Sequence, residues 1–343
     1  MVLDTGSPGG VWAVAFHSDR KHLLGGGDDG TPRWRLADGQ EVGKQMGMQL
    51  LAISVSRDLK RVVCGTRNGG ASAWDAEMHE KVVNVEDTTS VYAVDVSPDS
   101  TKFATGTTRY EASVWSITTG QRLVGPLKHT NDVTGIRFSP DGELVATFTP
   151  GGSVCIFDSH NGDQRLDIKA DRPSRWTFGV TPLVWSDDGR QIFAILDNNK
   201  IKSFAFPTGS QLAESPILNY ERSISLAGNG KFIATVSDQA ISFLDSSTLA
   251  KIGTSIEDSK CMRSIAISLD SSQIAIGRLD GTIIIHDLAS FLPDSHGPFH
   301  VSICPFIRLA CWINTIQSSI LTHFIRRLLT NLKNSIQMSS LRP

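Results

Sequence analysis

The chain has 343 residues, with 33 lysines and arginines, 35 acidic residues and a formal net charge of −2. No acid follows Asp294 whereas five basic residues do, so the rest of the chain holds 28 basic residues against 35 acids. A body this acidic argues against binding nucleic acid through phosphate neutralisation, and no nucleic-acid partner is expected.

A short acidic turn occurs seven times, and a bulky residue follows each copy 15 or 16 residues later. The turn residues are Asp19, Asp58, Asp99, Asp141, Asp188, Asn229 and Asp270, and their bulky partners are Trp34, Trp74, Trp115, Phe157, Phe204, Leu244 and His286. Successive copies start 39 to 47 residues apart. This period is typical of a four-stranded propeller blade and too long for leucine-rich, ankyrin or tetratricopeptide units.

Residues 133–158 show the unit most clearly, with apolar alternation in 133–138, 144–147 and 153–158 and tight turns at Pro140-Asp141-Gly142 and Gly151-Gly152. Alternation predicts strands, and these residue pairs predict hairpin turns. A glycine five residues after the bulky position, as at Gly162, marks the turn into a fourth strand. The fold class is therefore all-β. We expect a leader of residues 1–9 and then a seven-bladed β-propeller of four-stranded antiparallel blades over 10–304, with blades starting near residues 11, 50, 91, 133, 181, 222 and 262.

The units resemble the WD-repeat family, including its divergent adaptor and fungal arrays. Trp74-Asp75 is an intact signature dipeptide, and Phe157-Asp158 and Leu244-Asp245 are partial ones. The family's Gly-His pair survives only as Lys128-His129, and Pro32 falls in a predicted third strand, where it favours an irregular segment. The resemblance covers residues 10 to about 290 and implies a scaffold that binds partners on the narrower face of the propeller.

The connection after Phe157 is five or six residues longer than its counterparts, and the extra residues fall within 170–179. Arg172, Arg175, Trp176 and Phe178 combine cations and aromatic area there, a composition enriched in binding hot spots. Two interpretations stay open. The segment is either a partner-binding loop or a loop whose Trp and Phe cap the neighbouring blade.

Turns between second and third strands carry Arg67, Arg109 with Tyr110, and Arg278, beside Asp28-Asp29 of the first blade. Closure of the ring would place blades seven, one, two and three side by side. The arginines could then bind an acidic or phosphorylated peptide, because guanidinium groups form paired hydrogen bonds to carboxylate and phosphate oxygens. The alternative is that each arginine is solvated or paired locally.

Other motifs carry no predicted chemistry. His286 is interpreted as a packed structural histidine, Gly25–Gly30 as a hairpin turn, and Asp4-Thr5-Gly6-Ser7 as a chance match to the aspartic protease motif, which needs two carboxylates. No catalytic residue, cofactor or metal site is predicted. The five cysteines show no paired metal-type spacing and are expected to be reduced, which favours a cytoplasmic location, with the nucleus as an alternative.

The last residues, 305–343, form a different segment. Apolar residues recur there at every fourth position from Trp312 to Ile336, which predicts a basic amphipathic helix. Such a helix could lie on an anionic membrane, dock into a partner or pack on the propeller; a segment without an evolved role is the other interpretation. Residues 299–303 are expected to supply the outer strand of blade seven, because the ten residues before Val11 offer little for that role.

The function that these observations favour is a noncatalytic scaffold or recognition module for a protein or peptide. Two alternatives remain. One is a propeller enzyme, similar to quinone-dependent dehydrogenases or hydrolases, with its site in the central channel. The other is a peripheral membrane protein held by the tail. Neither the partner nor the oligomeric state follows from the sequence.

Overall fold

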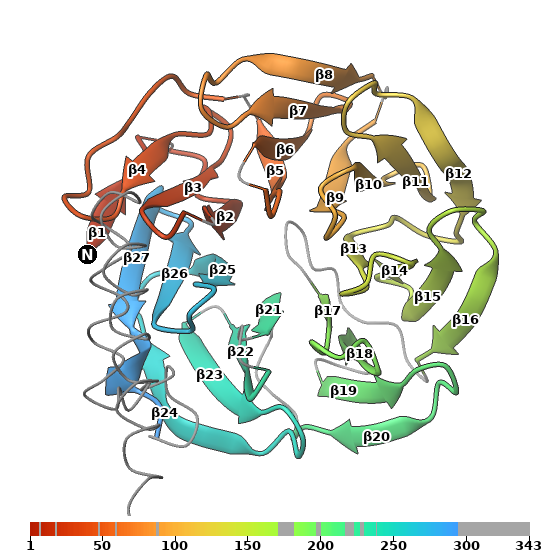
Figure 1. Ribbon diagram of the computed structural model, residues 1–343. Helices are drawn as coiled ribbons and strands as arrows, with labels where there is room; N and C mark the ends of the chain where they lie inside the picture. Colours follow the sequence, from red (N-terminus) through yellow and green to blue (C-terminus); the bar gives the residue numbers. More distant parts are fainter. Residues whose placement is uncertain are drawn as a thin grey trace, which may run out of the picture. The chain divides into compact units, whose positions relative to one another are not determined.

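The computed structural model describes residues 1–6, 8–17, 19–46, 49–58, 60–86, 89–170, 182–196, 200–216, 223–226, 230–237 and 239–293. Within these residues, seven antiparallel sheets surround a central axis in chain order (Figure 1). Six sheets have four strands and one has three. The predicted all-β, seven-bladed propeller is confirmed, and the described part contains no α-helix.

Each blade is a meander that runs from an inner first strand to an outer last strand. The first four blades consist of β2 (Ala13–Phe16), β3 (His22–Gly26) and β4 (Arg33–Arg35); β5 (Leu50–Val55), β6 (Arg61–Thr66), β7 (Ala71–Asp75) and β8 (Lys81–Val85); β9 (Val91–Val96), β10 (Lys102–Thr107), β11 (Glu111–Ser116) and β12 (Arg122–Lys128); and β13 (Gly135–Phe138), β14 (Leu144–Thr149), β15 (Ser153–Asp158) and β16 (Gln164–Lys169).

The remaining three blades follow the same order. They consist of β17 (Leu183–Trp185), β18 (Gln191–Leu196), β19 (Lys200–Ala205) and β20 (Gln211–Glu214); β21 (Ser223–Leu226), β22 (Phe232–Val236), β23 (Ala240–Asp245) and β24 (Lys251–Glu257); and β25 (Met262–Ile267), β26 (Gln273–Arg278) and β27 (Thr282–Asp287) with β1 (Val2–Asp4). A short 3-10 helix, η1 (Leu288–Ser290), follows β27.

Blade one is the irregular unit. Its third strand, β4, is only three residues long and begins directly after Pro32, as the proline predicts. A single bridge between Trp34 and Glu41 stands where the other blades have a fourth strand. This blade is therefore held by fewer ladder hydrogen bonds than its neighbours.

The repeated turn aspartates hold the hairpins between first and second strands. In five blades a serine hydroxyl two residues earlier donates to the aspartate at 2.5–2.7 Å, in the pairs Ser56–Asp58, Ser97–Asp99, Ser139–Asp141, Ser186–Asp188 and Ser268–Asp270. Each carboxylate also accepts the backbone N–H two residues later at 3.0–3.1 Å. Each serine oxygen accepts the backbone N–H five residues later at 2.9–3.0 Å. The sequence repeat is thus a repeated capping network.

These turns make stability depend on pH. The hydrogen bonds from the Ser186 hydroxyl and the Arg190 N–H lower the pKa of Asp188. Because the pKa is lower in the folded protein than in the unfolded chain, the ionised carboxylate stabilises the fold fully above the unfolded-state pKa of about 3.9. This stabilisation is lost as the pH falls through the folded-state pKa. Asp188→Asn keeps an acceptor oxygen but does not titrate. We expect the urea midpoint of this variant to fall less than that of the wild type between about pH 5 and pH 2.5. Asp29→Asn, on an exposed turn of blade one, serves as the control. An equal fall of the urea midpoint with pH in the wild type and in both variants would contradict the prediction.

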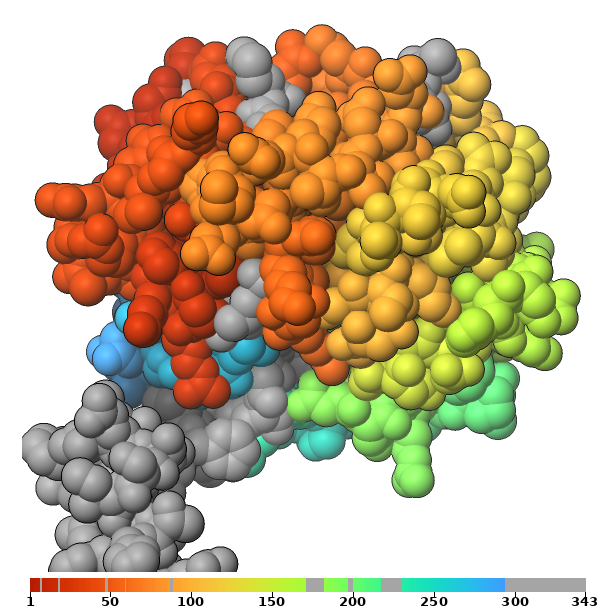
Figure 2. Space-filling view, turned by 45° about the horizontal axis from the view of Figure 1, so that its top comes forward, coloured from red at the N-terminus to blue at the C-terminus, as the bar shows by residue number. Residues whose placement is uncertain are grey.

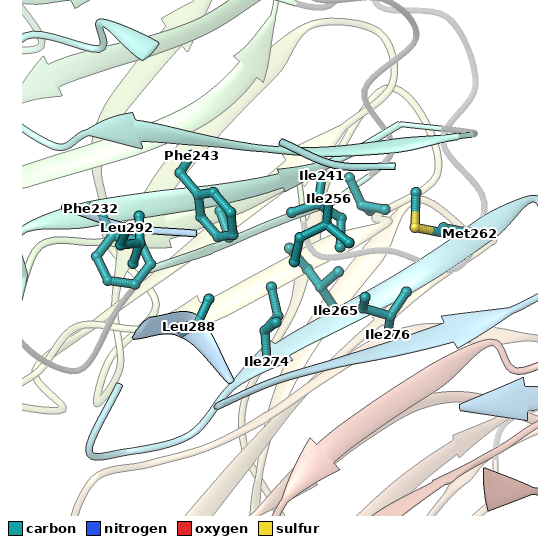
Figure 3. Close-up of a cluster of buried hydrophobic side chains, with 12 residues drawn as sticks. Phe232, Ile241, Phe243, Ile256, Met262, Ile265, Ile274, Ile276, Leu288 and Leu292 are labelled. Atoms are coloured by element: carbon teal, nitrogen blue, oxygen red, sulfur yellow. The ribbon is translucent and has the colours of Figure 1, made fainter. Parts of the chain in front are cut away.

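The core is divided among the interfaces between adjacent blades. Between blades six and seven, Phe232 and Phe243 pack edge to face with ring centroids 5.9 Å apart (Figure 3). Ile274 and Ile276 approach from β26, and Leu288 of η1 closes the cluster (Figure 3). In the space-filling view, the orange surface of blade two meets the yellow surface of blade three without a gap (Figure 2). A blade buries its apolar faces only against its neighbours, so the closed ring is what stabilises each unit.

The ring is closed by β1, which pairs antiparallel with β27. The Met1 ammonium donates to the Ile285 carbonyl at 2.9 Å, and the Thr5 hydroxyl donates to the Gly281 carbonyl at 2.7 Å. Leu3 is buried among residues of blades seven and one. The expectation that the residues before Val11 contribute little is therefore wrong, because three of them already complete the ladder of β27. Residues 299–303 lie outside the described residues.

The remaining motifs fall in structural positions. His286 packs edge to face on Phe291 with ring centroids 5.6 Å apart, and Asp4 ends β1 opposite Thr282. Burial raises the pKa of the free Cys64 thiol to about 12. No helix in the described part is long and apolar enough to cross a bilayer. The described propeller falls within a first compact unit, Met1–Pro298; the second unit contains the predicted helix of 305–343, which lies outside the described residues and stays a prediction.

Candidate partner-binding face and central channel

The turns between second and third strands lie beside the starts of the following blades. The Gln49 N–H donates to the Asp28 carbonyl at 3.0 Å, and the Arg67 N–H donates to the Gln49 carbonyl at 3.0 Å. The Ser90 hydroxyl donates to the Arg67 carbonyl at 2.7 Å, and the Thr108 N–H donates to the Ser90 carbonyl at 3.2 Å. This series of hydrogen bonds joins blades one, two and three along one end of the propeller.

Blade seven joins the same series. The Val11 N–H donates to the Arg278 carbonyl at 2.8 Å, which places the turn after β26 beside the start of blade one. The predicted adjacency of blades seven, one, two and three is therefore present. We call this end the arginine face and define it by Trp12, Asp28, Arg67, Arg109, Tyr110 and Arg263.

Trp12 contacts two arginines, one from each neighbouring blade. The guanidinium carbon of Arg263 is 4.6 Å from a Trp12 ring centroid, and that of Arg67 is 5.5 Å away. A guanidinium Nη of Arg67 also lies 3.4 Å from Asp28 Oδ1. Cation–π contact and this ion pair hold Arg67 in place while its side chain stays 46% exposed. The result is a fixed, partly exposed positive group.

Trp12 and Arg263 were not predicted from the sequence. Both lie at the second residue of their blades. The equivalent residues are Tyr92 in blade three and Thr134 in blade four. Trp12, Tyr92 and Thr134 line the central channel. Their equivalent positions in the repeat could have indicated that they lie at the same end of the propeller. The cation–π contacts themselves form only because separate blades approach one another.

Arg109 and Tyr110 form the exposed turn of blade three. Tyr110 has a φ of 61°, a left-handed conformation that few non-glycine residues adopt. Its carbonyl accepts the His129 N–H at 2.8 Å, and its side chain is 47% exposed. The turn therefore presents an arginine and an aromatic ring to solvent on the arginine face.

Arg278 differs from the other predicted arginines. Its guanidinium pairs with Asp258, and the two side chains are only 12% and 9% exposed. Lys260 pairs with Asp280 on the adjacent turn. Arg278 is thus paired locally and largely buried, so we leave it out of the surface that could receive a partner.

The predicted inserted segment, 170–179, lies outside the described residues except for Ala170. Arg172, Arg175, Trp176 and Phe178 therefore have no described positions. Their assignment as a binding loop stays a prediction.

The central channel is a hollow of about 930 Å³, lined mainly by first strands. Its ionisable groups include Arg57, Asp95, Arg137 and Asp187. Asp95 accepts the Phe138 N–H at 2.8 Å and lies 3.2 Å from an Arg137 Nη. Burial raises the pKa of Asp95, against the opposing effect of Arg137. The Ser54 hydroxyl also donates to this carboxylate at 3.2 Å, so Asp95 links blades two, three and four.

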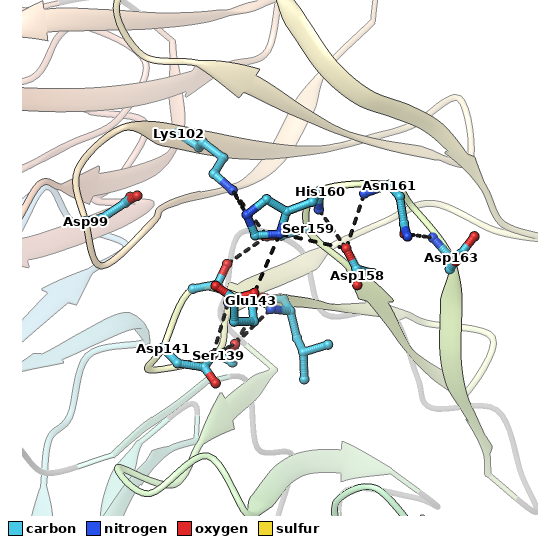
Figure 4. Close-up of polar contacts among 12 residues, drawn as sticks. Asp99, Lys102, Ser139, Asp141, Glu143, Asp158, Ser159, His160, Asn161 and Asp163 are labelled. Atoms are coloured by element: carbon cyan, nitrogen blue, oxygen red, sulfur yellow. Dashed lines mark hydrogen bonds and ion pairs between the residues drawn. The ribbon is translucent and has the colours of Figure 1, made fainter.

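A serine, a histidine and two acids meet at the opposite end of blades three and four (Figure 4). Lys102 Nζ lies 3.2 Å from His160 Nε2 and 3.3 Å from Ser159 Oγ. The Ser159 hydroxyl is buried and donates to the Gly142 carbonyl at 2.7 Å. His160 Nδ1 lies 3.8 Å from both Glu143 and Asp158 carboxylates. A buried hydroxyl that donates to the backbone is not placed as a nucleophile, so we interpret this group as a tie between two blades.

One further polar group was missed from the sequence. His17, Asp19 and His22 converge in the first turn of blade one, with both Nδ1 atoms near Asp19 Oδ2. Burial lowers the pKa of His17, whereas the neighbouring Asp19 carboxylate acts in the opposite direction.

The fold and its repeats define the class of this protein. A sequence model of the WD40 family, described as "WD domain, G-beta repeat", matches residues 2–33 and 121–158. These segments contain strands of the first, third and fourth blades and the closing strand β1. These segments match WD repeats, and the described residues form a seven-bladed propeller, as the signature dipeptides suggest.

Comparison with known proteins gives relatives of the same class. The chain is 26% identical over 250 residues to eukaryotic translation initiation factor 3 subunit I of Aspergillus terreus and 25% identical over 204 residues to the same subunit of Aspergillus fumigatus. It is 30% identical over 105 residues to the protein LST8 homolog of Drosophila melanogaster. These alignments cover 66%, 55% and 28% of this chain, respectively. The chain spans 68%, 59% and 33% of the lengths of these relatives.

Proposed function

We propose that this protein is a noncatalytic interaction module that binds a protein or peptide on the arginine face. The observation that carries the proposal is the Arg67–Trp12–Arg263 stack, which holds two cations and an aromatic ring in a fixed arrangement at the edge of the channel. Arginine and tryptophan are enriched among residues that dominate binding energy. A pre-formed group of this kind loses little side-chain entropy when a partner binds.

The charge of the stack favours an acidic or phosphorylated segment as partner. Arg67 and the exposed Arg109 lie on adjacent blades, joined through Ser90. Guanidinium groups on separate blades can bind successive carboxylate or phosphate groups of an extended peptide. Asp28, which neutralises part of the Arg67 charge, would compete with such a ligand and limit its affinity.

The relatives support a role within an assembly. The Aspergillus proteins are named as a subunit of translation initiation factor 3, and a subunit acts through contacts with other chains. Transfer of that role to this chain is part of the proposal. The specific assembly is a matter for experiment.

Charge reversal at Arg67 tests the proposal. We expect Arg67→Glu to reduce partner capture from a lysate of the native organism by roughly tenfold or more, because a hot-spot residue contributes on the order of 2 kcal/mol. Quantitative mass spectrometry of affinity-captured partners is the measurement. A synthetic peptide from the captured partner, acidic or phosphorylated, then gives the dissociation constants directly.

Arg35→Glu is the matched control. Arg35 is also 46% exposed and also pairs with one aspartate, Asp38, which is 37% exposed like Asp28. It is the last residue of the third strand of blade one and so lies at the other end of the propeller. Equal partner loss from both variants, or from neither, would count against the arginine face.

Two further variants separate the remaining candidates. The double variant Arg175→Glu, Trp176→Ala tests the inserted loop by the same capture. Liposome flotation of the full chain and of a chain ending at residue 304 tests membrane binding by the tail, and flotation that depends on 305–343 would favour the peripheral membrane alternative.

A further inference from the structure

The first turn of blade one brings two imidazoles and a carboxylate together. His17 Nδ1 lies 3.1 Å and His22 Nδ1 lies 2.6 Å from Asp19 Oδ2. One ligand atom from each of the three side chains lies within 4.8 Å of the others. The group comes from six consecutive positions, so a hairpin alone sets its geometry.

Blade one departs here from the turns of the other blades. Five blades place a serine two residues before the aspartate, and its hydroxyl donates to the carboxylate. In blade one this position is His17, and the position three residues after the aspartate is His22. A histidine can replace the serine as the hydrogen-bond donor to the aspartate. The other turns use one such serine donor, whereas this turn places two histidines at one carboxylate oxygen.

The two oxygens of Asp19 have separate tasks. Oδ1 accepts the Lys21 N–H at 2.8 Å and the His22 N–H at 3.1 Å, which fixes the carboxylate on the turn. Oδ2 faces both imidazoles. A carboxylate held by backbone donors through one oxygen, with the other directed at two imidazole nitrogens, is oriented as metal ligands usually are.

The protonation pattern of His17 is poorly satisfied by hydrogen bonds alone. The Asp19 N–H donates to His17 Nδ1 at 3.3 Å, which needs a lone pair on that nitrogen. The same nitrogen lies 3.1 Å from Oδ2, and a proton on Nδ1 that is donated to this oxygen would exclude the contact with the Asp19 N–H. His17 is 6% exposed, and its Nε2 is buried without a hydrogen-bond partner among the described residues. A cation bound by Nδ1 and Oδ2 would use the single Nδ1 lone pair in place of the Asp19 N–H contact and would be attracted to both atoms.

We propose that His17, Asp19 and His22 form a binding site for a divalent transition metal, with zinc as the best match. Two imidazole nitrogens and one carboxylate oxygen are a common ligand set for Zn²⁺, at about 2.0–2.2 Å from the metal. A water molecule would complete a tetrahedron, because Asp19 and His22 are partly exposed. The hard-oxygen cations Ca²⁺ and Mg²⁺ are disfavoured by the two nitrogen ligands.

The site would stabilise the blade with the fewest strands. Blade one lacks a full fourth strand, and the metal would cross-link the hairpin between β2 and β3. A ligand that binds only the folded state raises its stability by mass action. The positive charge of Arg33 acts on His17 and opposes a cation, so we expect Arg33→Gln to bind zinc more tightly than the wild type.

The test is calorimetric titration of the full chain with ZnCl₂ after dialysis against a chelator. We expect one zinc site, which requires the turn from His17 to His22. Zinc should also raise the midpoint of thermal unfolding. His22→Gln retains a hydrogen-bond donor for Asp19 but removes a nitrogen ligand. Because loss of an outer-sphere partner alone costs roughly 10–100-fold in affinity, loss of this ligand should cost at least about tenfold.

His160→Gln is the control, since it removes an exposed histidine from the corresponding end of blade four. A second variant, Cys304→Ser with Cys311→Ser, distinguishes the turn from thiol sites in the tail. The thermal unfolding midpoints of all variants, measured in the presence of chelator, show whether the variants fold. Zinc binding that is unchanged in His22→Gln, or abolished by the cysteine changes, would overturn the proposal, as would the absence of binding by the folded wild type.

Discussion

Leu3→Ala is expected to lower the free energy of unfolding by about 2–5 kcal/mol, the range for removal of a buried leucine side chain from a packed core. Leu3 is 3% exposed and packs with Val11, Val14 and Ile283 between blades seven and one. The strand that carries it is the closing strand of the ring. A cavity at this position weakens the contact on which circular closure depends. Urea denaturation followed by circular dichroism measures the effect.

The neighbouring residue supplies the control. Val2 lies on the same strand but is 63% exposed, so Val2→Ala should change stability by less than about 0.5 kcal/mol. Deletion of residues 1–5 should cost at least as much as Leu3→Ala, because it also removes the ladder to β27. If Leu3→Ala and Val2→Ala proved equally stable, β1 would not be the strand that closes the ring.

Arg278→Met should lower the free energy of unfolding by about 3–5 kcal/mol, the usual cost of leaving one member of a buried ion pair unpaired. The Asp258 carboxylate is only 9% exposed and would lose the guanidinium that compensates its burial. Asp258 stands in the connection between blades six and seven, whereas Arg278 ends β26. The pair therefore joins two segments that are 20 residues apart. Thermal and urea unfolding measure the loss.

A double-mutant cycle separates the pair from its surroundings. Asp258→Leu combined with Arg278→Met should recover most of the stability, because no buried charge is then left alone. The double variant should also keep its captured partners, since Arg278 is not offered to solvent. A double variant as unstable as the sum of the single variants would contradict the ion-pair explanation. Loss of captured partners from a stable double variant would instead indicate that Arg278 belongs to the partner-binding surface.

These stability variants also sharpen the binding experiments. Loss of partners in a variant at the arginine face is informative only when the ring remains closed. Leu3→Ala weakens closure without changing any residue of the arginine face. Its capture profile therefore shows how far partner loss follows from stability alone.

The arrangement of the seven units could be predicted because its signals are local. Strand alternation and tight turns depend on neighbours within a few residues, as the Ser139–Asp141 network shows. Pro32 likewise shortened β4 through its own missing N–H. Each feature recurs in unit after unit, which made the pattern readable despite divergent blades.

The functional surface depended on contacts that a linear pattern does not contain. Arg67 and Arg278 occupy equivalent turns, yet Arg67 stacks exposed on Trp12 whereas Arg278 is buried against Asp258. The difference lies in which acids and rings the adjacent blades bring close. Likewise, the stack with Arg263 joins residues about 250 positions apart, and only closure of the ring sets that distance.

The sequence by itself therefore determined the class of fold, the number of blades and the hairpin turns, because hydrogen bonding and burial within a meander repeat over short ranges. The tertiary structure decided that β1 closes the ring, which arginines stay exposed and that His17 faces Asp19 and His22. Ring closure and the packing of separate blades select the first two outcomes, since both bring together groups whose separation along the chain carries no local signal, whereas the hairpin of blade one sets the third.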